Sequence, residues 1–254
     1  MIPTADELVT DCSRCQGLCC VATGFSRSAD FPIDKPPGVP CSNLDPDFRC
    51  RVHDALPALG FRGCVRFDCL GAGVRVSRAA GERTWREHPA FSATLFAAFA
   101  RMRALHELLF YLHEARTRLA DDPLHASIDA ALAGVEAVCS GALEDLATLD
   151  VDAVRSRAAP LLRTASERLR SASPGPRLDL AGKDLIGKDL TRKDLRGASL
   201  RGALLIGARL DGLDLSLADF TGADVRDASA RGARLDGALF LRPDQRRDLG
   251  RGEP

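Results

Sequence analysis

The sequence predicts a mixed fold of three consecutive segments: a loop-rich cysteine module at residues 1–85, a small helical bundle at 86–172, and a four-sided coil with a C-terminal cap at 173–254. Three observations lead to this prediction. Eight of the nine cysteines lie in the first segment, apolar residues recur at helical spacing in the second, and a five-residue repeat fills most of the third.

Bulk composition excludes several functional classes. The 254 residues carry 35 basic and 35 acidic side chains, so no global field attracts nucleic acid or an anionic membrane. The N-terminus lacks the basic and apolar regions of a secretory signal, and no apolar run is long enough to span a bilayer. We therefore expect a soluble cytoplasmic protein without a membrane partner.

The stretch CSRCQGLCC, residues 12–20, holds four cysteines in nine positions. Disulfides, structural zinc and an iron–sulfur cluster are the competing explanations. Because disulfides rarely persist in the cytosol, clustered thiols in that compartment favour a metal. The predicted metal ligands are Cys12, Cys15, Cys19, Cys20, Cys41, Cys50, Cys64 and Cys69.

The spacing of these cysteines leaves the number of sites open. Cys12 and Cys15 are separated by two residues, which suits two thiolates on one ion. Cys19 and Cys20 are adjacent, and neighbouring side chains diverge, so they seldom bind one metal together. The pattern predicts either two sites or one cluster with spare thiols.

The cysteine order resembles that of the zinc- or iron-chelating CxxCxxCC family, which includes the flagellin lysine methylases. The resemblance covers roughly residues 12–70 and implies iron or zinc as the cofactor, with an iron–sulfur cluster slightly favoured. The sequence departs from the family in having three residues before the Cys-Cys pair, and in having His53 where the family has tyrosine. We interpret His53 as a packed residue in the place of that tyrosine, with ligation as the alternative. No S-adenosylmethionine pocket is visible, so methylation does not carry over.

Residues 86–172 are predicted to form helices. A seam with gaps of three and four predicts one long packed helix; its members are Phe91, Leu95, Ala98, Met102, Leu105, Leu109 and Leu112. Asp122 with Pro123 predicts the start of a second helix, and Asp150 that of a third, which Pro160 should kink or split.

Three further residues of these helices have simple interpretations. Cys139 lies on an apolar stripe and is expected in the core rather than at a metal. His106 and His113 are flanked by charged residues, so we expect both to be solvated on a helix face.

From residue 178 the sequence advances in steps of five. The central position of each step is apolar or small: Leu180, Leu185, Leu190, Leu195, Leu200, Leu205, Leu210, Leu215, Phe220, Val225, Ala230, Leu235 and Phe240. A period of five fits neither a heptad nor a sandwich strand. It suits a square coil that turns a corner every five residues and stacks the central side chains inside.

This pattern over residues 178–242 resembles the pentapeptide-repeat family, which implies a right-handed quadrilateral β-helix, a solenoid with about four repeats per coil. Two positions before the centre, where the family prefers a small inward residue, Lys183, Lys188 and Lys193 depart from the pattern. Buried ammonium groups would be prohibitively costly, so we expect this first coil to be an open end with exposed lysines.

These observations predict a non-catalytic cytoplasmic protein that binds an iron–sulfur cluster or zinc and uses its solenoid as a scaffold for a protein partner. No Walker loop, nucleophile elbow or catalytic triad can be assembled. One alternative is an iron–sulfur oxidoreductase or modifying enzyme. The other is a topoisomerase-binding DNA mimic, as in quinolone-resistance members of the repeat family. A mimic needs an acidic rod, whereas residues 176–254 hold 15 basic and 13 acidic side chains.

Overall fold

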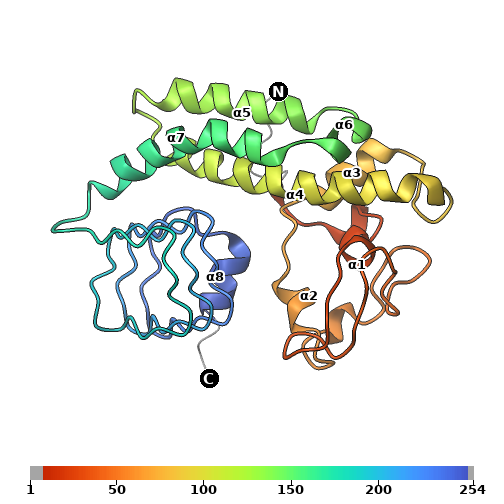
Figure 1. Ribbon diagram of the computed structural model, residues 1–254, viewed down its shortest axis with the longest axis horizontal. Coiled ribbons are helices and arrows are strands. Elements are labelled where there is room, and N and C mark those ends of the chain that lie inside the picture. Colours follow the sequence, from red (N-terminus) through yellow and green to blue (C-terminus); the bar gives the residue numbers. More distant parts are fainter. Residues whose placement is uncertain (1–7, 251–254) are drawn as a thin grey trace. The chain divides into compact units, whose positions relative to one another are not determined.

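The computed structural model describes residues 8–250, and Figure 1 follows the chain from the loop-rich N-terminal segment through the long helices to the repeats. The chain divides into two compact units. The first unit comprises Met1–Phe110 and Ala130–Arg157, and the second comprises Tyr111–Asp129 and Ala158–Pro254.

The N-terminal part of the first unit contains only short helices, in keeping with its many prolines and glycines. They are the 3-10 helices η2 (Cys12–Arg14) and η3 (His53–Ala55) and the α-helices α1 (Leu18–Ala22), α2 (Arg62–Arg66) and α3 (Ala72–Ala80). Loops join these helices, so contacts between distant segments position the cysteines.

Longer helices follow: α4 (Pro89–Arg118), α5 (His125–Cys139), α6 (Leu143–Thr148) and α7 (Val151–Arg170). Asp150 caps α7 as predicted, because its carboxylate accepts a hydrogen bond from the Ala153 amide at 3.0 Å. Pro160 does not split α7, which continues through the proline as one helix. The split, one of the two predicted outcomes, is therefore wrong. No helix within residues 8–250 is long and apolar enough to cross a lipid bilayer.

The apolar seam predicted for the long helix lies on α4, where Leu95, Met102 and Leu105 are fully buried. Cys139 is buried at the end of α5, as expected. The expectation of solvated histidines is wrong: His113 is half-buried, and His106 is only 1% exposed.

His106 is buried because it binds a backbone group of the cysteine module. Its Nδ1 lies 2.6 Å from the Leu70 carbonyl oxygen, and since a carbonyl can only accept, Nδ1 carries the proton. Its Nε2 is buried without a hydrogen-bond partner in the described part of the chain. Burial therefore lowers the pKa of His106 to about 4, from an ordinary value of 6.5.

This histidine predicts a loss of stability in mild acid. The unfolded chain takes up the proton near pH 6.5 and the folded chain only near pH 4, so the stabilisation is complete above pH 6.5 and fades as the pH falls towards 4. We expect the free energy of unfolding to fall by about 2–3 kcal/mol between pH 7.5 and 4.5 through this residue. Urea denaturation of the wild type and of His106→Asn, whose amide keeps an N–H donor, measures it. An equal pH dependence in both proteins would contradict the assignment.

The predicted quadrilateral β-helix is wrong as a description of the fold: helices are the regular secondary structure of residues 8–250, and those residues form no β-strand. Residues 178–241, here called the repeat stack, consist instead of successive turns. Isolated parallel bridges join residues twenty positions apart, such as Asp179 to Ser199 and Asp184 to Leu204. Since turns separate the bridged residues, no extended run is long enough to make a strand.

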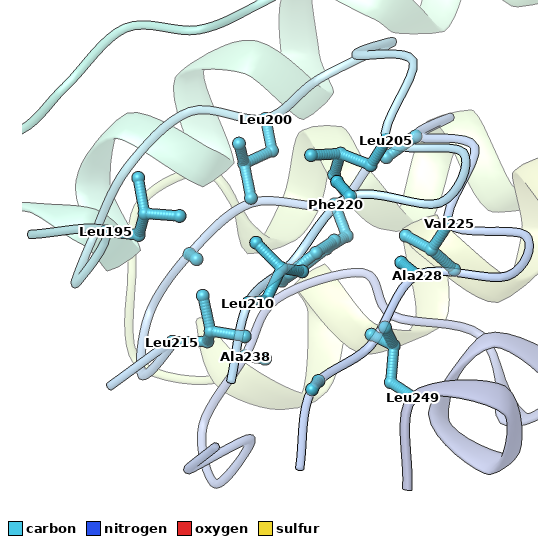
Figure 2. Close-up of a cluster of buried hydrophobic side chains, with 14 of the residues drawn as sticks. Leu195, Leu200, Leu205, Leu210, Leu215, Phe220, Val225, Ala228, Ala238 and Leu249 are labelled. Carbon is cyan, nitrogen blue, oxygen red and sulfur yellow. The ribbon is translucent and has the colours of Figure 1, made fainter. Parts of the chain in front are cut away.

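The interior of the repeat stack contains the central residues of the repeats. Figure 2 shows their side chains pointing toward one another, among them Leu195, Leu200, Leu205, Leu210, Leu215 and Phe220. The small inward residues are buried as well, including Ala198, Ala203 and Ala208. Lys183, Lys188 and Lys193 are exposed, as the cost of burying an ammonium group requires.

Helix α8 (Pro243–Gly250) covers the C-terminal end of the repeat stack. Leu249 belongs to the apolar cluster inside the stack, and the Gln245 side-chain amide donates to the Ala223 carbonyl at 2.7 Å. This helix satisfies a backbone acceptor that would otherwise be left at the end of the stack.

Candidate metal centre

All eight cysteines that the sequence singles out line one cavity of about 700 Å³ in the first unit. They come from segments up to 57 positions apart, from Cys12 to Cys69. The remaining cysteine, Cys139, does not line it. The cavity wall is largely apolar, with Phe25, Phe31, Phe61, Phe67 and Phe99 among its residues.

The segment from Cys12 to Cys20 is held by local caps and by helix α1. Asp11 accepts a hydrogen bond from the Ser13 amide at 2.8 Å, and Gly17, directly before α1, takes a left-handed backbone conformation (φ 66°) that glycine adopts without strain. Leu18 and Val21 of α1 are fully buried. Burial of this face of the helix leaves Cys19 and Cys20 at the cavity, with their sulfurs 3.9 Å apart.

The loop carrying Cys41 and Cys50 is attached to α1 through the backbone. The Cys41 amide donates to the Cys20 carbonyl at 2.9 Å, and the Gly38 amide donates to the Val21 carbonyl at 2.8 Å. A bridge between Leu44 and Cys50 closes the next turn. Cys41 and Cys50 are thereby brought to the same side of the cavity as Cys20.

Cys64 lies on the short helix α2. The Gly63 amide donates to the Asp30 carbonyl at 3.0 Å, and Arg66 forms an ion pair with the Asp30 carboxylate at 3.0 Å. Phe31 stacks on Phe25 with ring centroids 4.1 Å apart. This aromatic pair and the ion pair fix α2 beside the loop of residues 25–35.

Cys15 and Cys69 both lie over Gly73 of helix α3. A Cβ at position 73 would be 2.7 Å from the Cys15 sulfur and 3.8 Å from the Cys69 sulfur. Thr10 also contacts the Cys69 sulfur, with its hydroxyl oxygen at 3.3 Å. The glycine is required because any side chain there would displace the Cys15 sulfur.

Lys35 is a buried cation beside the thiols that sequence reasoning missed. The residue is 4% exposed, and its ammonium group donates to a cage of backbone carbonyls, namely those of Val21, Thr23, Pro36 and Val39. Burial lowers the pKa of Lys35, and the neighbouring thiolates act in the opposite direction. The sequence does offer one signal for a buried lysine here, because Lys35 is the only lysine in the proline-rich stretch DKPPGVPC.

The thiols are strongly coupled to one another. Burial, and to a lesser extent repulsion by the thiolates of Cys20, Cys41 and Cys50, raises the pKa of Cys64 to about 12. Thiols with such pKa values are protonated at neutral pH unless a cation offsets the repulsion. Within residues 8–250, no three histidine, cysteine, aspartate or glutamate side chains are gathered closely enough to hold one metal ion.

His53 does not occupy the packed position expected of it. Its side chain is 66% exposed at the edge of the cavity, and its Nδ1 lies 3.4 Å from the Asp54 carboxylate. The interpretation of His53 as a buried aromatic replacement is therefore wrong, because η3 turns this residue toward solvent.

Comparison with known proteins identifies the C-terminal part of the chain. Residues 178–212 and 198–237 match the model of the pentapeptide repeats, with eight copies. The chain is also 42% identical over 173 residues, 68% of its length, to the Bacillus subtilis (strain 168) protein named "Uncharacterized protein YybG". The match spans 62% of that relative's own length. Residues 178–237 of this chain are thus a region of pentapeptide repeats.

Proposed function

We propose that the N-terminal part of the chain binds a thiophilic metal, as an iron–sulfur cluster or zinc, and that the repeat stack is a surface for a protein partner. The metal then stabilises the loops or reports redox state, without turnover. The observation that carries this proposal is the convergence of all eight cysteines of residues 12–69 on one cavity.

The donor set suits such a metal. Thiolates are the preferred protein ligands of zinc and of iron–sulfur clusters. Burial is the main cause of the raised pKa of Cys64, and repulsion by the neighbouring thiolates adds to it; a bound cation would relieve that repulsion. When bound, zinc would crosslink the loops, and an iron–sulfur cluster would add one-electron chemistry.

A metal would also supply stability that the short helices lack. Helices α1 and α2 have only five residues each, and the connecting loops bury few large side chains. A crosslink among four or more loop positions restricts the unfolded chain, so ligation is coupled to folding.

Metal content provides the direct test. Protein purified without oxygen is expected to contain iron with acid-labile sulfide and a broad absorption band near 400 nm, or stoichiometric zinc without colour. Cys139→Ala, which removes a thiol outside the cavity, should retain the same metal. Chelation should lower the midpoint of thermal unfolding. Absence of thiophilic metal from the wild type, or an unchanged melting profile after chelation, would overturn a structural metal.

The repeat stack supports the second half of the proposal through its surface. Ile186 and Leu204 are 47% and 40% exposed, and the bridge between Asp184 and Leu204 puts them on neighbouring turns. Such apolar groups on a polar, rigid surface favour contact with another protein.

Charge pairing argues against the DNA-mimic alternative. Several acidic groups of the stack pair with arginines one turn away, including Asp189 with Arg209 at 2.9 Å and Asp211 with Arg231 at 3.1 Å. An array of phosphate-like charges requires unpaired carboxylates. The repeat stack therefore presents a neutral surface.

The enzymatic alternative has one specific observation in its favour. The cavity of about 700 Å³ has a largely apolar wall, so it offers room beside the thiols for an organic molecule. Reversible bleaching of a visible band by dithionite and its return with a mild oxidant would favour this second candidate. Zinc alone would exclude it.

A further inference from the structure

The eight thiols of the cavity are not equivalent. They fall into two groups of four, distinguished by which thiols act on one another and by which backbone segments hold them. The first cysteine set is Cys12, Cys15, Cys19 and Cys69. The second cysteine set is Cys20, Cys41, Cys50 and Cys64.

The first cysteine set gathers around helix α3 and Gly73. Cys15 and Cys69 both lie over this glycine, as a Cβ there would be 2.7 Å and 3.8 Å from their sulfurs. The thiols that act most strongly on Cys12 are Cys15 and Cys69. Cys19 completes the set, since beyond its neighbour Cys20 it is repelled by Cys12 and Cys15.

Three members of the second cysteine set, Cys20, Cys41 and Cys64, lie near Lys35, as does Cys19 at the boundary. Cys64 is repelled by Cys20, Cys41 and Cys50, and no member of the first set is among its main neighbours. The hydrogen bond from the Cys41 amide to the Cys20 carbonyl holds two of these residues together.

The adjacent pair Cys19 and Cys20 forms the boundary between the sets. Their sulfurs are 3.9 Å apart, and each is the strongest partner of the other; beyond this pair, Cys19 is repelled by Cys12 and Cys15, whereas Cys20 acts on Cys64 and, less than Cys15 and Cys69 do, on Cys12. The positive charge of Lys35 also stabilises the Cys20 thiolate. Consecutive side chains on a short helix diverge by about 100°, so two consecutive cysteines can serve two separate centres.

We propose that the chain holds two metal centres, each bound by one cysteine set, rather than one cluster with spare thiols. This inference rests on the proposed function and assigns its ligands. Four thiolates complete a zinc site or an iron–sulfur cluster, so each set has the required number of donors. Within residues 8–250 no three of these donors already lie close enough to hold one ion, so closure of a set requires rotation of its cysteine side chains; a change of χ1 between staggered positions moves a sulfur by about 3 Å.

A titration with Co²⁺ of the full chain, reduced and free of oxygen, tests the proposal without any variant. Thiolate-to-cobalt absorption is expected to rise to a break at two equivalents. A break at one equivalent would overturn the assignment of two centres while leaving metal binding intact. No thiolate-to-cobalt absorption at all would overturn the proposed function itself.

Variants then separate the sets. Cys12→Ser in the first set and Cys50→Ser in the second are each expected to halve the bound metal, and the double variant to lose both centres. Cys12 is exposed and Cys50 is half-buried, so neither substitution leaves a cavity in the hydrophobic core. Cys139→Ala is the control and should bind two equivalents. Loss of all metal from one single variant, with circular dichroism unchanged, would show one shared centre and overturn the partition.

Discussion

Replacement of Asp219 by alanine is expected to lower the free energy of unfolding by about 3–5 kcal/mol. The carboxylate of Asp219 is fully buried, and it accepts hydrogen bonds from Arg201 at 3.0 Å, from Ser166 at 2.5 Å and from Thr221. Removing it leaves the Arg201 guanidinium, itself only 20% exposed, without its charged partner. Urea denaturation followed by far-ultraviolet circular dichroism measures the loss.

The repeat provides a matched control in Asp189. Both aspartates stand at the same position of the repeat and cap a threonine two residues later, Thr191 in one turn and Thr221 in the other. Asp189 also pairs with an arginine, Arg209, but both partners are about half exposed. Asp189→Ala should therefore lower the free energy of unfolding far less than Asp219→Ala, because solvent screens its ion pair with Arg209. Equal losses from the two variants would show that burial of the Asp219 pair contributes nothing.

Replacement of Phe220 by alanine is the second change with a large expected effect, also about 3–5 kcal/mol. Phe220 is fully buried, and Figure 2 shows its ring among the leucines inside the repeat stack. The turns around it are joined by backbone hydrogen bonds, including Phe220 N–H to the Leu239 carbonyl at 3.0 Å. These bonds hinder collapse of the stack into the cavity that the alanine leaves, so most of the lost packing is not recovered.

Leu204→Ala is the control for this prediction. Leu204 belongs to the same repeat stack but is 40% exposed, so its truncation should cost less than about 1 kcal/mol. The denaturation midpoint should move strongly for the phenylalanine variant and hardly for the leucine variant. A small shift for Phe220→Ala would contradict close packing inside the stack.

The interior of the repeat stack could be predicted from the sequence because its pattern is local. The five-residue period alone identifies Leu195, Leu200 and Phe220 as inward residues, and all three are buried. The period says where the chain turns but not how much extended backbone lies between turns. The predicted strands were wrong for that reason, since only isolated residues of the stack pair with the next turn.

Burial of individual polar residues could not be predicted, because it depends on contacts between distant segments. The charges around His106 indicated a solvated face, yet this face meets Leu70, 36 positions earlier. Asp219 occupies an outward position of the repeat but is covered by Ser166 of α7. Neither contact leaves a signal in the spacing of nearby residues.

The candidate site was predictable in its residue types and not in its arrangement. Clustered cysteines indicated thiols that line one cavity, but their spacing did not indicate that Cys69 lies beside Cys15 over Gly73 or that the Cys41 amide bonds the Cys20 carbonyl. The loops between them decide this grouping. Lys35 escaped notice because its environment is made of backbone carbonyls, which any residue type supplies.

The four lysines of the chain differ in a way that matters for chemical handling. Lys35 is caged by carbonyls and almost inaccessible, whereas Lys183, Lys188 and Lys193 are exposed on consecutive repeats. Reaction at lysine side chains will therefore fall on the first turns of the repeat stack and not on Lys35 of the cysteine module. A sensor surface coupled through these amines would hold the protein by one end of its stack, leaving the thiol-lined cavity untouched by the coupling chemistry.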